Sequence, residues 1–427
     1  MITVTYKKMI KIRKILTLVL SAICTTALAI SPYDLQKPFG FCTVSSRNSS
    51  DSTYNITGGG CYKYPIKGVK KDRVITLTAT GKDMKQEITK AVKDYDVIVF
   101  DGQKGDFIVS SIISFKELKN KTLLGINHAK LCTTWFATQE IIKALNDAGV
   151  PQMSSSKNTG GTLSNGNKVS EEAEFNTRQI IINMTGDEKE AYRNSGVFFF
   201  KDCENLIIRN LTFQGPGSID VGGSDLVSLY GSKHCWIDHC DFMDGMDGNF
   251  DITRLSDFIT VSWCTFSYNE RSYMHQNTNL VGANDNEQTG YLNITYAFNE
   301  WGKGCKARMP MARVGKIHML NNYYNCAGNA TNCINPRRNS EFLIEGNYFE
   351  KKIYRYYGQK DAVSVTWGKD NFVSERHGQD APQSFGETVT VPYKYKMVKS
   401  SVIPTEVGNN AGATLFGDSS TSAKPIK

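Results

Sequence analysis

The chain has 427 residues, of which 40% are hydrophobic and 22% are charged. This ordinary globular composition excludes a disordered tail protein, a collagen-like repeat and a membrane protein with many spans, and the length favours two domains or one elongated repeat fold. The formal net charge is +8, but five of the 50 cations lie in residues 1–29, so that beyond them 45 cations face 42 acids. That small excess gives no argument for a nucleic-acid partner.

Residues 1–29 have the layout of a secretory signal peptide. A basic stretch that ends at Lys14 precedes an apolar run over residues 15–22, and small residues follow at 27–29. An N-terminal membrane anchor is the alternative, but the apolar run is short for crossing a bilayer. We therefore expect a secreted protein, extracellular or periplasmic, with no membrane attachment after the signal is removed.

Ten of the eleven cysteines lie beyond this segment. Export permits disulfides, but so low a cysteine content is not that of a disulfide scaffold, and the lack of a CxxC pair argues against structural zinc. The closest pairs that could be bridged are Cys42 with Cys61 and Cys326 with Cys333, and the sequence leaves both open.

The first part of the chain predicts one helix and three short strands. Residues 83–95 place their apolar side chains on a single helical face, and the apolar runs 97–100, 122–126 and 179–182 are interpreted as strands. Residues 134–178 are predicted to be a surface excursion because 150–171 are rich in Ser, Gly, Asn and Lys. We expect one domain over residues 30–417 and a flexible polar tail over 418–427.

The most informative pattern is a repeat that begins near residue 205. Six segments share a template of alternating apolar residues that ends in an aromatic: 205–213 (NLIIRNLTF), 234–242 (HCWIDHCDF), 258–266 (FITVSWCTF), 293–301 (NITYAFNEW), 316–324 (KIHMLNNYY) and 341–349 (EFLIEGNYF). Their aromatic ends are 23 to 35 residues apart, with no long amphipathic helix between them. One short strand in each such interval is typical of a parallel β-helix.

In a β-helix, equivalent side chains of successive coils lie on top of one another, about 4.8 Å apart. The template then predicts an aromatic stack from Phe213 to Phe349 and, two residues before the aromatic, a ladder of Asn299, Asn322 and Asn347. A β-sandwich is the alternative, but it does not explain why one residue type recurs at one place in successive strands. The predicted fold class is therefore all-β, a right-handed single-stranded parallel β-helix with an N-terminal capping helix and long loops.

Two groups of charged residues could carry chemistry. Asp225, Asp247 and Asp251 can converge if they lie on consecutive coils, and carboxylates without Cys or His suit a hard cation such as Ca²⁺, although turn residues are an equal alternative. Arg308 and Arg313 flank a proline and could bind carboxylates in a bidentate manner, or be solvated surface residues. The pair Asp238-His239 has no serine elbow near it, so His239 is interpreted as a core histidine.

Three stretches in this order resemble pectate lyases of polysaccharide lyase family one: 236–242 (WIDHCDF), 247–263 (DGNFDITRLSDFITVSW) and 308–323 (RMPMARVGKIHMLNNY). The resemblance extends from about residue 38 to residue 412. It implies a monomeric enzyme that uses Ca²⁺ to cleave de-esterified polygalacturonate, an acidic plant cell-wall polysaccharide, by β-elimination, giving unsaturated oligogalacturonides.

The resemblance also implies the roles of individual residues. It makes Asp225, Asp247 and Asp251 the calcium ligands, Arg308 the base and Arg313 a clamp for a substrate carboxylate. The family usually has a histidine and then a lysine after the strand that ends at Phe266, and Arg271 stands here for the substrate-binding lysine. A pectin lyase for methyl-esterified polymer would not need the three aspartates, and a non-catalytic β-helix adhesin would need neither the aspartates nor the arginines together.

Overall fold

The computed structural model describes residues 37–148, 176, 179–184, 195–218, 224–272, 275–373 and 382–416. The chain divides into two compact units, Met1–Lys37 and Pro38–Lys427, and the description below concerns the second unit. The predicted signal peptide, the predicted tail and most of residues 134–178 lie outside the described residues. Among the described helices, none has the length and apolar character that a membrane crossing requires.

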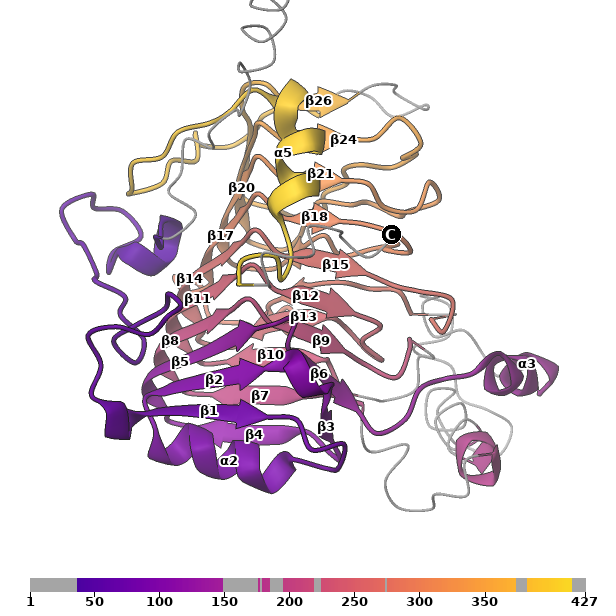
Figure 1. The fold of residues 1–427 in the computed structure, drawn as a ribbon. Coiled ribbons are helices and arrows are strands. Elements are labelled where there is room, and N and C mark those ends of the chain that lie inside the picture. Colours follow the sequence, from indigo (N-terminus) through magenta and orange to yellow (C-terminus); the bar gives the residue numbers. More distant parts are fainter. Residues whose placement is uncertain are drawn as a thin grey trace, which may run out of the picture. The chain divides into compact units, whose positions relative to one another are not determined.

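Three sheets of parallel strands run along the molecule (Figure 1). The ten-stranded sheet contains, in spatial order, β1 (Val74–Thr78), β2 (Val97–Asp101), β5 (Lys119–Ile126), β8 (Glu204–Arg209), β11 (Lys233–Asp238), β14 (Asp257–Ser262), β17 (Asn293–Ala297), β20 (Lys316–Leu320), β23 (Glu341–Glu345) and β25 (Ser364–Trp367). The nine-stranded sheet contains β3 (Phe107–Val109), β6 (Lys130–Thr133), β9 (Thr212–Gln214), β12 (Asp241–Met243), β15 (Thr265–Ser267), β18 (Glu300–Trp301), β21 (Tyr323–Tyr324), β24 (Tyr348–Phe349) and β26 (Phe372–Val373).

The seven-stranded sheet contains β4 (Ile113–Lys116), β7 (Phe198–Lys201), β10 (Val227–Tyr230), β13 (Phe250–Thr253), β16 (Leu280–Val281), β19 (Met311–Ala312) and β22 (Asn335–Pro336). Within each sheet, the spatial order of the strands follows the order of the sequence, so each coil contributes one strand to a sheet and the next coil lies beside it. The predicted parallel β-helix is therefore confirmed.

Each of the six predicted strands is in fact two strands with a bend between them. The residue at the bend has a positive φ, as in His239 (48°), Phe298 (56°) and Asn321 (50°), and this left-handed conformation turns the chain from the ten-stranded into the nine-stranded sheet. The strands of the seven-stranded sheet were not predicted, because a strand of two to four residues is too short to show an alternating pattern.

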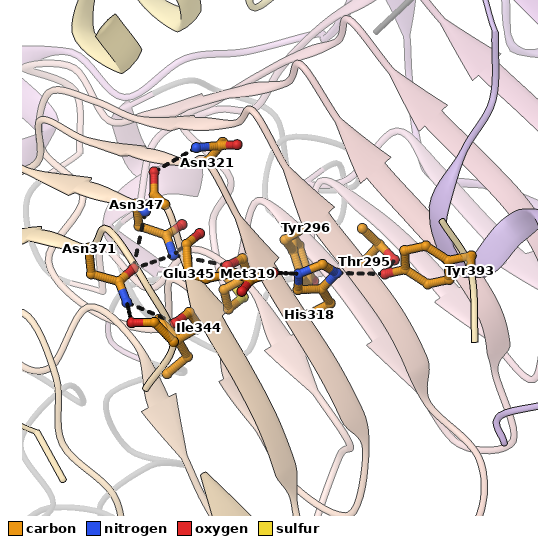
Figure 2. A network of polar contacts seen from close by, with 12 residues as sticks. Thr295, Tyr296, His318, Met319, Asn321, Ile344, Glu345, Asn347, Asn371 and Tyr393 are labelled. Carbon is orange, nitrogen blue, oxygen red and sulfur yellow. Dashed lines mark hydrogen bonds and ion pairs between the residues drawn. The ribbon is translucent and has the colours of Figure 1, made fainter. Parts of the chain in front are cut away.

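The stacking that the template predicts is confirmed inside the coil. Ring centroids of successive coils lie 4.4 to 5.4 Å apart from Phe213 to Phe349. In the asparagine ladder, the Nδ2 of Asn299 donates to Oδ1 of Asn322 (3.1 Å), and Asn322 donates in the same way to Asn347 (3.0 Å). Figure 2 shows that Asn347 donates to Asn371 (3.0 Å), one coil beyond the predicted end.

The described cysteines are all free thiols and all buried. Neither candidate bridge is formed: the Sγ atoms of Cys326 and Cys333 lie 3.6 Å apart, and Cys42 is not bonded to Cys61. Cys240 and Cys264 stack on neighbouring coils as thiols. The core is thus held by packing and hydrogen bonds in the described part of the chain.

The helices lie at the edges of the coil. Helix α2 (Lys85–Asp94) buries Ile88, Ala91 and Val92 and lies beside the first coil, where a cap was predicted (Figure 1). Residues 179–184 are helical, so the strand predicted over 179–182 is wrong; a short apolar run does not distinguish a helix from a strand. The remaining helices are α3 (Gln139–Asp147), α5 (Ile403–Asn410) and the 3-10 turns η1 (Gly40–Thr43), η2 (Lys71–Arg73), η3 (Gly102–Lys104) and η4 (Ser400–Val402).

Segments from both ends of the described chain cover the outer face of the ten-stranded sheet. The backbone N–H of Phe41 donates to Oγ1 of Thr295 (3.0 Å), and the hydroxyl of Tyr393 is hydrogen-bonded to Thr295 (2.6 Å) and to Nδ1 of His318 (2.8 Å) (Figure 2). Nε2 of His318 lies 3.2 Å from a carboxylate oxygen of Glu345. Helix α5 lies over the nine-stranded sheet near β21, whereas the outer positions of the seven-stranded sheet include partly exposed side chains on most of its strands (Figure 1).

Candidate functional site

Two of the predicted aspartates meet at the seven-stranded sheet. Asp251 is the second residue of β13 and is paired with Ser228 of β10, whose hydroxyl donates to Oδ2 of Asp225 (3.0 Å). A Cβ atom built at Gly248 would lie 2.8 Å from Oδ1 of Asp225 and 3.0 Å from Oδ1 of Asp251. Both carboxylates therefore lie close to Gly248, and any larger residue at this position would collide with them.

Burial disfavours the charged form of both carboxylates. Burial, and then the charge of Asp225, raise the pKa of Asp251 well above its ordinary value. Burial, and then the charge of Asp247, raise the pKa of Asp225, whereas its hydrogen bonds with Ser228 and Asp251 act to lower it. A nearby positive charge stabilises such a pair in its ionised form, because it offsets both the loss of water and the mutual repulsion.

The third aspartate is engaged by a histidine that the sequence analysis missed. Oδ1 of Asp247 lies 3.1 Å from Nε2 of His275, and Asp247 remains half-exposed. Although burial acts to raise it, this hydrogen bond and the charge of His275 hold the pKa of Asp247 below its usual value. His275 lies in the longest interval of the repeat, where a loop leaves the coil, and that interval was the available signal.

Arg308 lies beside these aspartates, on the loop that leads into β19. Its backbone has a positive φ of 58°, and its carbonyl oxygen accepts a hydrogen bond from the N–H of Asn279 (2.7 Å). Its charge lowers the pKa of each of the three aspartates, which is the direction expected of a neighbouring cation. The structure therefore brings Arg308 and the three acids, far apart in sequence, into one electrostatic group.

Arg313 follows β19 on the same face. Its Nε lies 2.9 Å from a carboxylate oxygen of Asp285, and its Nη1 donates to the carbonyl of Gly282 (3.0 Å). Burial lowers the pKa of Arg313, and the charges of Arg308 and Arg337 act in the same direction. Three guanidinium groups are thus close enough to repel one another, which favours an anionic ligand.

The structure places Arg271 elsewhere. Its Nε lies 3.5 Å from Oδ2 of Asp244, and its guanidinium carbon lies 4.3 Å from the ring centroid of Phe136. Asp244, just after β12, also accepts hydrogen bonds from the backbone of Asn269 (2.7 Å) and from the hydroxyl of Ser272 (2.9 Å). These contacts belong to the nine-stranded sheet, and a substrate-binding role for Arg271 stays a prediction.

His239 is a core residue, as expected. It is fully buried, its Nδ1 lies 2.7 Å from Oδ2 of Asp238, and the same oxygen accepts from Nε of Arg209 at 2.8 Å. The hydroxyl of Ser262 donates to the other oxygen of Asp238 (2.7 Å). This buried group holds neighbouring coils together and has no part in the surface site.

The aspartates fit a hard cation only in part. Among the described residues, no three side chains of His, Cys, Asp or Glu lie close enough together to form a ready metal site. Asp225 and Asp251 supply two oxygen ligands across Gly248, and oxygen ligands are those that Ca²⁺ prefers. Asp247 would supply a third carboxylate ligand if its side chain turned away from His275.

Comparison with known proteins identifies the family to which the chain belongs. A family model described as pectate lyase matches residues 152–415. Pectate lyase A of Aspergillus niger is 32% identical over 225 residues, 50% of this chain and 64% of that protein. The pectate trisaccharide-lyase of Thermotoga maritima is 28% identical over 319 residues, 73% of this chain and 62% of that protein. The chain thus spans just under two thirds of the length of these two relatives.

Solved structures have the same fold. A thermostable pectate lyase superposes with a TM-score of 0.54 at 17% identity, covering 90% of this chain and 97% of that chain. A pectate lyase of Bacillus subtilis superposes with a TM-score of 0.51 at 18% identity, covering 88% of this chain and 99% of that chain. At such identities the likeness concerns the fold alone.

Proposed function

We propose that this chain, which belongs to the pectate lyase family, is a secreted lyase that cleaves de-esterified polygalacturonate by calcium-assisted β-elimination. The observation that carries the proposal is the meeting of Asp225 and Asp251 across Gly248, within reach of the charge of Arg308. A carbohydrate-binding surface that uses no metal has no need for two adjacent buried carboxylates, whereas a lyase that uses a cation needs such oxygen ligands.

The residues take complementary roles in this proposal. Asp225, Asp251 and Asp247 would hold the calcium ion, which when bound neutralises the uronate carboxylate and so makes the C5 proton more acidic. Arg308 removes that proton. The bond between C4 and the glycosidic oxygen breaks as the C4–C5 double bond forms, and the oxygen leaves with a proton from solvent.

Arginine is an unusual base, because a guanidinium is protonated at ordinary pH. For Arg313, burial lowers the pKa, and the charges of Arg308 and Arg337 act in the same direction, against the charge and hydrogen bond of Asp285. Arg313 would hold a substrate carboxylate, with the uronate competing against Asp285, whose side chain is 62% exposed.

The test is cleavage of polygalacturonate followed by ultraviolet absorbance of the unsaturated product. We expect absorbance to rise with Ca²⁺, to stop with a chelator, and to be much weaker on highly methyl-esterified pectin. Arg308→Lys should lower kcat at least about 100-fold while polymer binding is retained, the size of effect expected for loss of a general base.

The control is Arg338→Lys, at an exposed arginine outside the group of acids. It should leave turnover unchanged. Near-normal turnover of Arg308→Lys would refute the assignment of the base, and binding without cleavage of either polymer by the unsubstituted chain would favour a carbohydrate-binding protein.

A further inference from the structure

One row of outward positions crosses the seven-stranded sheet from end to end. Strand pairing places Lys116 opposite Lys201, Lys201 opposite Tyr230, and Tyr230 opposite Thr253. Backbone hydrogen bonds continue the row: Gly282 donates to Ile252 (3.0 Å), Arg313 to Val281 (2.9 Å) and Arg337 to Ala312 (2.8 Å). The row therefore has cations at both ends, with neighbouring positions about 4.8 Å apart.

Tyr230 lies in this row between two cations. The Nζ of Lys201 is 5.3 Å from the centroid of the Tyr230 ring, and the guanidinium carbon of Arg254 is 5.7 Å from it. The ring of Phe199 lies 5.8 Å away at 53°. Lys201, Tyr230 and Phe199 are half-buried and Arg254 is exposed, so an aromatic surface with a charge on each side faces solvent.

Among the described residues, neither Lys201 nor Arg254 has a carboxylate within ion-pairing distance. The carboxylate of Glu287, which is buried, accepts the backbone N–H groups of Arg254 (3.2 Å) and Ala283 (2.8 Å). A cation–π contact at an exposed position contributes only about 0.5–1 kcal/mol, so stability alone is a weak reason for this arrangement.

The position relative to the aspartates suggests a ligand. Tyr230 follows Ser228, the partner of Asp225, by two residues on β10, so the two side chains are on the same face and about 6.6 Å apart along the strand. A polyuronate has one carboxylate on every sugar. Tyr230 and Arg313 lie in one row, with Thr253 and Gly282 between them, so a polyuronate that is held at Arg313 can follow this row past the aspartates to Tyr230.

The geometry points to a further substrate subsite, in which Lys201 and Arg254, one on each side of the Tyr230 ring, bind carboxylates of neighbouring sugars of a polyuronate. This inference rests on the proposed function and deepens it. The subsite lies in the same row as Arg313, at the level of Asp225 and Asp251, so it lengthens the segment of polymer that the enzyme holds.

The experiment compares Lys201→Met/Arg254→Met with Lys233→Met. Lys233 is a matched control because its Nζ also lies over an aromatic ring, 5.5 Å from the centroid of Tyr291. Unlike Lys201, it belongs to the ten-stranded sheet. Each change is made in the Arg308→Lys chain, and binding of galacturonate trimers and hexamers is measured by calorimetry in CaCl₂. Thermal unfolding is recorded for each variant, and kcat and KM on polygalacturonate are measured in the chain with Arg308 intact.

We expect the double variant to bind the hexamer about tenfold more weakly, because one to two charged hydrogen bonds are lost. It should bind the trimer as tightly as the chain without these two substitutions does. Its KM on polygalacturonate should rise with little change in kcat, and Lys233→Met should resemble the unsubstituted chain. Equal hexamer binding by the double variant and the control would overturn the subsite while leaving the proposed function intact. Failure of the unsubstituted chain to bind or cleave any of these substrates would overturn the proposed function itself.

Discussion

The imidazole of His234 lies between Tyr54, 3.5 Å away by ring centroids, and Phe258, 5.1 Å away, with both rings nearly parallel to it. Burial lowers the pKa of His234 from 6.5 to about 4. In the folded protein His234 therefore stays neutral at a pH where the same side chain in the unfolded chain accepts a proton. Stability from this residue is fully present above pH 6.5 and is lost as the pH falls toward 4.

We expect the free energy of unfolding to fall by about 2 kcal/mol from this source between pH 6.5 and pH 4, after allowance for solvent screening. His318 acts in the same direction, because burial lowers its pKa as well. His234→Phe, which keeps the stack, should flatten the pH dependence measured by urea unfolding. The substitution His128→Gln, at an exposed histidine, should leave this pH dependence unchanged. The same pH dependence in both variants would contradict the contribution of His234 to stability.

At the scale of an element, the asparagine ladder is the strongest link between coils. Oδ1 of Asn322 accepts hydrogen bonds from the backbone N–H (3.0 Å) and the side chain of Asn299. Its Nδ2 donates to the carbonyl of Tyr296 (2.9 Å) and to Asn347. Because Asn322 is fully buried, water cannot replace these partners when the side chain is removed.

Asn322→Ala is therefore expected to lower the free energy of unfolding by about 3 kcal/mol, the combined effect of several buried groups left without partners. Urea unfolding followed by circular dichroism measures this loss. The exposed Asn286→Ala provides the baseline, and it should change stability by less than about 0.5 kcal/mol. Similar values for the two variants would mean that the ladder does not stabilise the coil.

At the scale of the whole described unit, stacking brings acids and arginines from residues 225–313 to one face. The terminal segments cover the ten-stranded sheet through Phe41 and Tyr393, and α5 lies over the nine-stranded sheet. The seven-stranded sheet is left to carry the site. A cation bound there would relieve the repulsion between Asp225 and Asp251 in the folded state alone, and so couple metal binding to stability.

Adding CaCl₂ at about 100 times its Kd should therefore stabilise the protein by about 2.7 kcal/mol, seen as a higher Tm than in a chelator. Asp225→Asn/Asp251→Asn should abolish the calcium-dependent rise, because the oxygen ligands lose their charge. Asp51→Asn, at an exposed aspartate far from the site in the sequence, should keep it. If the Tm of the unsubstituted chain is the same in calcium and in chelator, the assignment of a calcium site to these aspartates is wrong.

The amino-acid sequence by itself determined the architecture and the candidate residues. A repeated template is visible because each coil must present the same kind of side chain to the coil above and below, as Phe213 to Phe349 and the asparagine ladder do. The separation of Asp225 from Asp251 matches one coil, and a resemblance of ordered stretches pointed to Arg308 and Arg313.

Only the tertiary structure decided which of these side chains meet. It paired Asp247 with His275, turned Arg271 to Asp244, and left Cys326 and Cys333 as thiols. The seven-stranded sheet, on which the site lies, also emerged only there. The physical reason is that a side chain's partners in a β-helix come from neighbouring coils and loops more than twenty residues away, and strands of two to four residues show no periodicity of their own.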